Sequence, residues 1–402
     1  MTLSVPFTKV STLIPRICSI EETESRVALI TNRIPITRVS NITPLDTLEV
    51  PVWCAFTPLA LDLTTHMGKG TTHKSARISA IMEAIERFSA ERSTSETRKS
   101  SWDELTSCGE KVLDPSCCDL PINTTFSKNK LFDWIAAEDI NSGESIYIPT
   151  DLALSPPRQG ILNRVDTNGL ASGNSLLEAS IHALTEVIER DAMGQHAFAD
   201  LYCSQENLIL PRCRIDQRTW PVSSALIAEN IKKKGLELFV DWLPTDIAVP
   251  TFRALLIDSL FLYRGSMRPR SFVGFGTAPD PDLAIQRSIT EAIQSRLAVI
   301  QGARDSFNII PCVPSGYSWH YRTMEQMLFP FDIVQGFRSL NLQEDLTWLR
   351  NRLVEAGFIK ILRIDLTRPE IQIPVVRIRV PGLSNFAVNK SRVGWRSLRF
   401  LL

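Results

Sequence analysis

The feature that most constrains this chain is a pattern that occurs three times. A glycine-bearing segment is followed each time by a helix-forming stretch with acids or amides at matched places, over residues 68–87, 168–190 and 274–296. The first two copies end in the motif E-x-x-E-R, and the third reads E-x-x-Q-x-R. The glycine precedes the first glutamate by thirteen residues in two copies and by fifteen in the third. These ordered matches suggest internal similarity, with a glycine-bearing strand end or turn before each helix.

The acids of the first two copies share helix faces. Residues three or four apart project from the same side of a helix, so Glu83 and Glu86 point together. Their helix carries an apolar stripe on the opposite side, made of Ile78, Ile81, Met82, Ile85 and Phe88. The second helix has a polar side (Glu178, His182, Glu186, Glu189) and an apolar side (Ile181, Leu184, Val187, Ile188).

Two interpretations of these faces are open. Glu83–Arg87 and Glu186–Arg190 are i,i+4 pairs, which stabilise an exposed helix by roughly 0.2–0.5 kcal/mol and need no further function. However, the second helix stacks acids at i, i+8 and i+11 with no lysine between them, and like charges in proximity destabilise. A bound cation would remove that repulsion.

The glycine segments add cations and an amide near the helix starts. Lys69, Lys74 and Asn174 suit contacts with phosphate or ribose at a helix N-terminus. Paired carboxylates beside such a segment are the hard oxygen ligands that Mg²⁺ prefers, with nucleotide phosphates completing its shell. None of the three segments matches a Walker A loop or G-x-G-x-x-G, so a nucleotide site here would be of another kind.

Helix and strand signals interleave along the whole chain, which predicts one mixed α/β (α+β) body. Residues 1–50 predict a helix–loop–strand lead-in, 93–130 a loop-rich insertion with at most one short helix, and 140–146 a hairpin turn. The predicted helices cover residues 75–91, 175–195, 222–234, 283–300 and 347–357. The predicted strands cover residues 50–57, 237–242, 250–257, 358–366 and 373–380.

Composition excludes several classes of protein. The 402 residues carry 44 Lys+Arg and 44 Asp+Glu, so there is no general electrostatic footprint for nucleic acid or an anionic membrane. The eight cysteines form no C-x-x-C pair, which favours scattered thiols of a cytosolic protein. We find no signal-peptide pattern at the start and no apolar run of the roughly 18–20 residues that span a bilayer. We therefore expect a cytoplasmic protein.

The three segments resemble the signatures of the YcaO family, in order, and Val380-Pro-Gly-Leu383 is similar to the end of its core domain. The resemblance spans roughly residues 30–385. It predicts a lead-in over 1–65 within the same body, a core domain over 66–385 and a short tail over 386–402. It implies a YcaO-type fold, commonly dimeric, with an unusual ATP site between glutamate-rich helices. The implied activity is ATP- and Mg²⁺-dependent activation of a peptide amide, giving an azoline or, with an external sulfur donor, a thioamide.

The resemblance also implies residue roles. Glu83, Glu86, Glu186 and Glu189 would bind Mg²⁺ and, with Arg190, form the catalytic set. The nucleotide would be held by Lys74, Asn174, Glu178, Arg190 and Arg287, with Ser172 as a weaker candidate. Buttressing roles are implied for Arg87, Glu291, Gln294 and Arg296, and a structural salt bridge is an equal alternative for the last of these. His182 is either a functional residue or a polar residue of the helix face.

Two departures from the family bear on the product. Many azoline-forming members end in a proline-rich tail, whereas the last proline here is Pro381. We see no fused leader-binding domain, so we expect a precursor peptide or protein substrate to be delivered by a separate TfuA-like or E1-like partner. The segment 36–52 is similar to members that act with TfuA, which favours a thioamide. The alternatives are a nucleotide-binding accessory protein that assists sulfur transfer, and a structural protein with salt-bridged helices.

Overall fold

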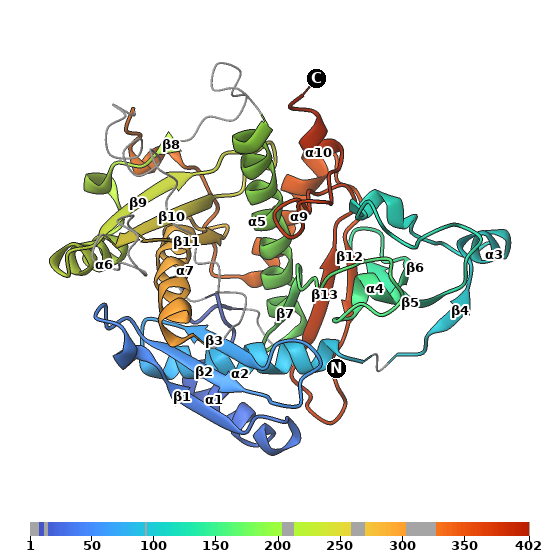
Figure 1. Cartoon of the computed structure of the whole chain (residues 1–402), viewed down its shortest axis with the longest axis horizontal. Helices are drawn as coiled ribbons and strands as arrows, with labels where there is room; N and C mark the ends of the chain where they lie inside the picture. Colours follow the sequence, from blue (N-terminus) through green and yellow to red (C-terminus); the bar gives the residue numbers. More distant parts are fainter. Residues whose placement is uncertain are drawn as a thin grey trace.

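Three antiparallel sheets organise the computed structural model, which describes residues 8–11, 15–92, 95–202, 213–258, 270–302 and 327–401 (Figure 1). The first sheet has the order β1 (Arg38–Asn41), β2 (Val52–Phe56), β3 (Thr65–Lys69). The second has the order β11 (Arg270–Thr277), β10 (Thr251–Asp258), β9 (Glu237–Trp242), β8 (Cys213–Arg214). The third has the order β4 (Arg98–Ser100), β5 (Phe132–Asp139), β12 (Leu362–Asp365), β13 (Val375–Arg379), β7 (Leu170–Ser172), with β6 (Ser145–Pro149) also paired to β5.

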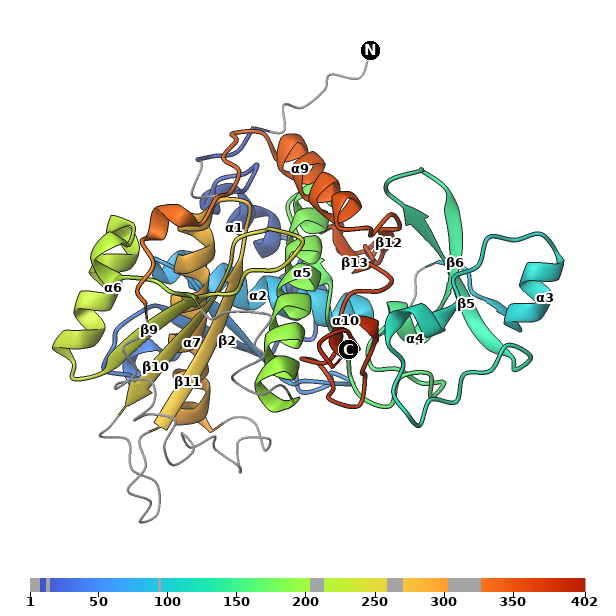
Figure 2. The same cartoon turned by 90° about the horizontal axis from the view of Figure 1, so that it is seen from above.

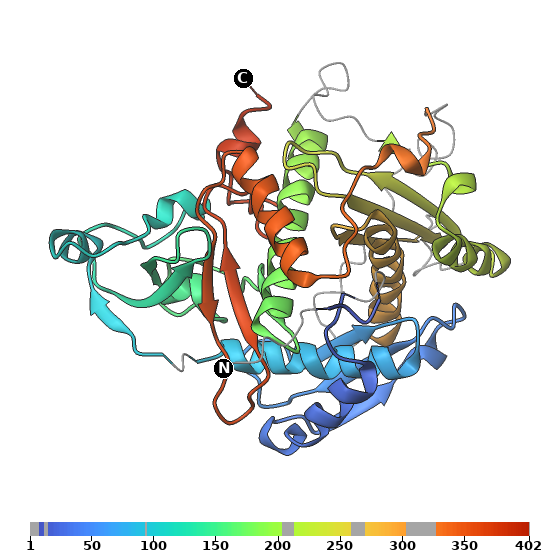
Figure 3. The ribbon, with the colours of Figure 1, turned by 180° about the vertical axis from the view of Figure 1, so that it is seen from behind.

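Three long helices connect these sheets. α2 (His73–Ala90) packs on the first sheet, α7 (Pro281–Gln301) on the second, and α5 (Leu176–Tyr202) on β13 and β7 of the third. Figures 1 and 3 show α2 running across the ends of α5 and α7. The remaining helices are α1 (Ile20–Ala28), α3 (Trp102–Ser107), α4 (Thr150–Ala153), α6 (Val222–Lys233), α9 (Leu342–Glu355) and α10 (Trp395–Leu398). In Figure 2, β4–β6 with α3 and α4 form a lobe at one end of the molecule. No helix among the described residues is long and apolar enough to cross a membrane.

The glycines of the repeated segments let helix and strand backbones touch. A Cβ atom on Gly68 of β3 would lie 2.0 Å from the backbone nitrogen of Ala80 in α2. A Cβ on Gly274 of β11 would lie 2.1 Å from the nitrogen of Ala292 in α7. Only glycine permits such close approach. The repeat is therefore a strand laid directly on the helix that follows it, and this packing accounts for the glycines without a phosphate.

Most predicted elements are confirmed, with shifts at their ends. α5 extends to Tyr202 rather than 195, because its last turns bury Phe198 against Phe386, with ring centroids 5.2 Å apart. α9 begins at Leu342 rather than 347, after the side chain of Asn341 caps it by accepting the Gln343 N–H. Residues 93–130 contain the one short α-helix allowed for, α3, and also strand β4, which was not predicted.

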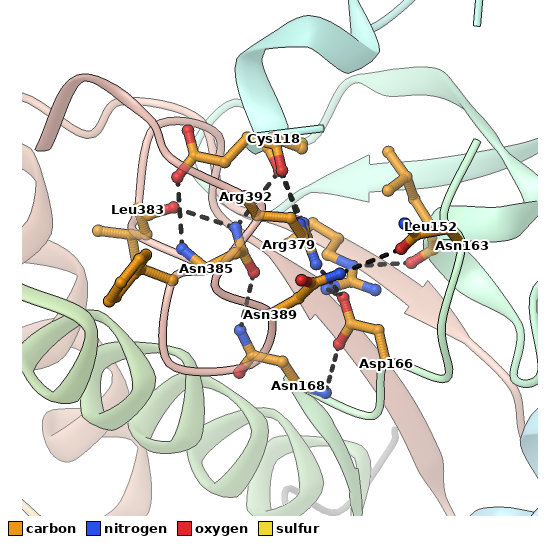
Figure 4. A network of polar contacts seen from close by, with 12 residues as sticks. Cys118, Leu152, Asn163, Asp166, Asn168, Arg379, Leu383, Asn385, Asn389 and Arg392 are labelled. Atoms are coloured by element: carbon orange, nitrogen blue, oxygen red, sulfur yellow. Dashed lines mark hydrogen bonds and ion pairs between the residues drawn. The ribbon is translucent and has the colours of Figure 1, made fainter. Parts of the chain in front are cut away.

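Buried ion pairs fasten the C-terminal segment to the core. Asp166 accepts hydrogen bonds from Arg379 of β13 (3.0 Å) and from Arg392 (2.7 Å), which also reaches the carbonyl of Cys118 (Figure 4). Arg396 of α10 binds both carboxylate oxygens of Asp191 in α5 at 2.7 Å. We call these pairings the arginine networks. Residues 386–401 are thus fixed to the body by charge-assisted hydrogen bonds.

Candidate active site

The candidate site lies where an end strand of each sheet meets a glutamate from a long helix. β3, β7 and β11 are the terminal strands of their sheets. In each of these strands a glutamate carboxylate accepts a backbone N–H. The donor–acceptor pairs are Met67–Glu83 (3.1 Å), Ser172–Glu86 (3.0 Å) and Phe275–Glu291 (3.3 Å). These bonds hold three carboxylates in place without neutralising their charge.

A cavity of about 1110 Å³ opens among these strands and helices. Among the described residues, the acids that line it are Glu83, Glu86, Glu186, Glu189 and Glu291. The bases that line it are Arg16, Lys69, Arg87, Arg190 and Arg287. We call this space the glutamate cavity. Its volume is slightly above the range of roughly 300–1,000 Å³ that is typical of ligand sites.

Burial and mutual repulsion raise the pKa values of three of these acids. Desolvation, followed by the neighbouring Glu83 carboxylate, raises the pKa of Glu86 to about 7. Desolvation also raises the pKa of Glu186 to about 7, and Glu86 adds to it. For Glu189 burial acts first and the Glu291 carboxylate second, again giving a pKa of about 7. A site that disfavours its own ionised carboxylates in this way is suited to a cation that stabilises them.

The helix salt bridges predicted from the sequence are present but loose. Glu83 and Arg87 are 3.9 Å apart, and Glu186 and Arg190 are 3.8 Å apart. Arg87 instead donates to Asp62 at 2.9 Å. The i,i+4 pairing therefore does not account for the acids, whose oxygens face the cavity rather than a close guanidinium.

Two arginines supply positive charge to the cavity. Burial lowers the pKa of Arg287 to about 10, and its Nη1 donates to the carbonyl of Thr277 at 3.0 Å. Burial alone would lower the pKa of Arg190, but Glu186 and Glu189 outweigh it and raise that pKa. Both guanidinium groups remain cationic at neutral pH, and planar cations of this kind recognise phosphate well.

Most of the site residues predicted from the sequence come together here. The cavity is lined by Glu83, Glu86, Ser172, Asn174, Glu186, Glu189, Arg190 and Arg287. The hydroxyl of Ser172 donates to Glu86 at 2.8 Å, so it orients a carboxylate. His182 also lines the cavity and has a pKa well below its ordinary value, because burial and then Arg16 disfavour its cation.

Three predicted residues do not line the cavity. Glu178 is fully buried behind it, paired with Arg16 at 2.6 Å and with the amide of Asn174 at 3.2 Å. Lys74 is half exposed and its ammonium pairs with Glu21 of α1 at 3.0 Å. Arg296 binds Asp46 and, at 2.8 Å, Asp258, which is the structural alternative named for it.

Two further cations line the cavity, of which the sequence indicated one and missed the other. Lys69, which the sequence indicated beside Lys74 as suited to phosphate contacts, forms an ion pair with Glu291 at 2.7 Å. Arg16 contacts both Glu178 and the Nδ1 atom of His182, the latter at 3.2 Å. The segment around Arg16 shows no pattern, and its partners are more than 160 residues away, so no local signal could have identified it.

The donor set of the glutamate cavity fits Mg²⁺ with a phosphate-bearing ligand. Hard carboxylate oxygens and guanidinium groups line the same cavity. This chemistry defines a class of protein that handles a metal-bound nucleotide. The chain belongs to the YcaO family: the family model, described as a YcaO cyclodehydratase that binds ATP and Mg²⁺, matches residues 67–384.

Relatives in sequence extend over nearly the whole chain. A protein of Methanothermobacter thermautotrophicus is 33% identical over 378 residues, which is 90% of this chain and 93% of that protein. A protein of the tfuA 3′ region of Rhizobium leguminosarum bv. trifolii is 30% identical over 373 residues, 87% of this chain and 83% of that protein.

Solved structures share the fold. YcaO from Methanopyrus kandleri bound with AMPPCP and Mg²⁺ has a TM-score of 0.73 at 22% identity, over 94% of this chain and 95% of that chain. A heterocyclase in complex with substrate and cofactor has a TM-score of 0.75 at 22% identity, over 95% of this chain and 54% of that chain. The chain therefore spans about half the length of that heterocyclase and nearly all of the Methanopyrus protein.

Proposed function

We propose that this chain uses Mg·ATP in the glutamate cavity to activate a backbone amide of a ribosomally made peptide. The observation that carries the proposal is the convergence of five glutamates, three of them with pKa values near 7, beside two arginines that line the same cavity. When bound, Mg·ATP supplies a phosphoryl group to the amide oxygen. That oxygen leaves with the group as phosphate once a nucleophile has added to the amide carbon. The protein's own residues bind and orient the reactants and exclude water from them.

Each group has a role in this proposal. The four glutamates of the two E-x-x-E motifs hold Mg²⁺, and Glu291 lies close enough to Glu189 to join them. Arg190 and Arg287 hold phosphate oxygens, and Asn174 orients the nucleotide from the end of β7. Ser172 donates hydrogen bonds to Glu86 from both its backbone N–H and its hydroxyl, and these bonds orient a carboxylate that would bind the metal. Lys74 and Glu178 are left with weaker support, because neither lines the cavity.

A thioamide is the product we favour over an azoline. The support is the 30% identity to a protein of the tfuA 3′ region, over most of both chains. An external sulfur donor then adds to the activated carbon, and the peptide exchanges oxygen for sulfur. A precursor peptide or protein is the substrate, a TfuA-like partner assists, and the working unit is a homodimer in the cytoplasm.

The experiment incubates the protein with Mg·ATP, a sulfide source, a TfuA-like partner and a candidate peptide encoded nearby, and measures the peptide's mass. Exchange of oxygen for sulfur supports the thioamide, and loss of water supports an azoline instead. Nucleotide binding with no turnover under every combination would favour the accessory role in sulfur transfer. Glu189→Gln is the matched control, because it keeps the size of the side chain and removes its charge.

A further inference from the structure

Lys69 occupies an unusual place in the glutamate cavity. It is the last residue of the end strand β3, and its neighbour Gly68 is pressed against the α2 backbone, which fixes the start of its side chain. Its ammonium lies 2.7 Å from Oε2 of Glu291 in α7. The two side chains are 23% and 29% exposed, so solvent and ligands reach the pair through the cavity.

The other oxygen of Glu291 is already held by the protein. Oε1 accepts the N–H of Phe275 at 3.3 Å, so Oε2 is the oxygen on which a cation can act. Lys69 also lies close enough to Glu189 to lower its pKa, against the larger opposing effects of burial and Glu291. The ammonium is therefore paired with Glu291, in a position where a divalent cation could bind the carboxylate instead.

Three other cations of the cavity hydrogen-bond to groups other than its glutamates, and the fourth, Arg190, lies 3.8 Å from Glu186. Arg87 donates to Asp62, Arg16 to Glu178, and Arg287 to the carbonyl of Thr277. Among the described residues, Glu291 is the hydrogen-bond acceptor of Lys69, and an ammonium has three protons to donate. The lysine stem is flexible, so its charge can move to a new anion nearby.

We propose that Lys69 is the counterion of Glu291 in the absence of nucleotide. When a polyphosphate binds, Lys69 moves to a phosphate oxygen, and Glu291 becomes free to bind Mg²⁺. Without nucleotide, Lys69 competes with Mg²⁺ for Glu291 and weakens the binding of the metal alone. With nucleotide, the lysine gains an anion and the carboxylate gains the metal, so each ligand strengthens the other. This coupling makes Mg²⁺ and nucleotide bind as a pair. It rests on the proposed nucleotide site and concerns a residue outside the E-x-x-E motifs.

The test measures Mg²⁺ affinity by calorimetry for the full chain and for Lys69→Met, first without nucleotide and then with saturating AMPPCP. We expect Lys69→Met to bind Mg²⁺ alone about fivefold more tightly than the unchanged protein. In the presence of AMPPCP we expect the same variant to bind Mg²⁺ about fivefold more weakly. A purely structural lysine would change both affinities in the same direction or neither.

Two further variants complete the test. Lys69→Arg keeps the charge and should retain most of the competition. Lys233→Met removes an exposed lysine that pairs with Glu229 at 2.8 Å on α6, and should change neither affinity. Weaker Mg²⁺ binding by Lys69→Met without nucleotide, or no change under both conditions, would overturn the counterion role. If the unchanged protein bound neither Mg²⁺ nor AMPPCP, the nucleotide site itself would fail.

Discussion

Two neighbouring residues of α5 belong to two charge clusters that differ in how their acids and bases are paired. Arg190 lines the glutamate cavity, whereas Asp191 binds Arg396 in the arginine networks. In those networks arginine donors hold each acid at close range, and the pKa of Asp166 is held well below its usual range: burial would raise it, but Arg379 and Arg392 outweigh burial. In the cavity no arginine of the described residues comes closer than 3.8 Å to a motif glutamate, and three pKa values rise to about 7.

The difference separates structural charge from functional charge. The arginine networks exclude water, whereas the groups of the glutamate cavity are partly exposed, for example 32% for Arg190 and 28% for Glu186. Where arginines hold every acid, removal of one partner destabilises the fold, and no carboxylate is left for a ligand. Where acids lie close together without such partners, their repulsion destabilises the folded state until a cation binds. The predictions below test that contrast, from the largest expected effect to the smallest.

Asp166→Asn should destabilise the protein by about 3–5 kcal/mol, because it leaves Arg379 and Arg392 buried without their anion. Urea unfolding of the two proteins measures the change. If the variant unfolded at the same urea concentration as the unchanged protein, the networks would not hold the tail as described.

Glu86→Gln should weaken ligand binding without destabilising the fold. We expect Mg²⁺ affinity in the presence of AMPPCP to fall about 10–100-fold, because a ligand charge is lost. The metal-free variant should melt at or above the temperature of the unchanged protein, since a repelling carboxylate is gone. A lower melting temperature with unchanged Mg²⁺ affinity would assign Glu86 a structural role only.

The pH dependence should have opposite signs in the two clusters. Glu86, Glu186 and Glu189 have folded pKa values of about 7 against ordinary values of 4.5, so the metal-free folded state holds extra protons between these pH values. Its stability therefore falls as pH rises through this window. The lowered pKa of Asp166 contributes stability that is present above its ordinary pKa and is lost only in acid.

Thermal melts with and without Mg·AMPPCP check this prediction. We expect a larger stabilisation by the ligand at about pH 8 than at about pH 5.5, because the glutamates must be ionised to bind the metal. A ligand effect that was independent of pH would contradict the raised pKa values.

Ser172→Ala should weaken Mg²⁺ binding about fivefold, since it removes one of two hydrogen bonds that orient Glu86 and leaves the other. Calorimetry with AMPPCP measures the change, and Ser25→Ala is a control, because that exposed hydroxyl donates only to a carbonyl within α1. An unchanged affinity in Ser172→Ala would show that the backbone N–H alone positions the carboxylate.

Lys74→Met should have the smallest effect on nucleotide affinity, less than about twofold, because its ammonium pairs with exposed acids of α1 outside the cavity. Fluorescent nucleotide binding measures it beside Lys69→Met. A tenfold loss in Lys74→Met would instead support the nucleotide role that the family resemblance implies.

Local patterns predicted the elements and the faces of the two glutamate helices. The spacing of Glu83 and Glu86 was enough to place both on one side of α2, and the glycine-first repeat was enough to place a strand end or turn before each helix. The sequence could not say that Gly68 serves a backbone contact, because close approach depends on how β3 lies on α2.

Contacts between residues far apart in the sequence could not be predicted from local sequence patterns. The choice between Lys69 and Lys74 depends on which side of β3 and α2 faces α7, and Arg16 meets Glu178 across 162 residues. The tail residues Arg392 and Arg396 gave no signal, since buried arginines cannot be told from exposed ones without their acids.

The most direct test of the central claim is calorimetric titration of the unchanged protein and of the double variant Glu86→Gln/Glu189→Gln with Mg·AMPPCP. We predict saturable binding to the unchanged protein that is lost in the absence of Mg²⁺. The double variant should show no binding, although its circular dichroism spectrum is unchanged and its melting temperature is at least that of the unchanged protein. Equal Mg²⁺-dependent binding by both proteins would contradict the account, because the paired glutamates would then not hold the metal.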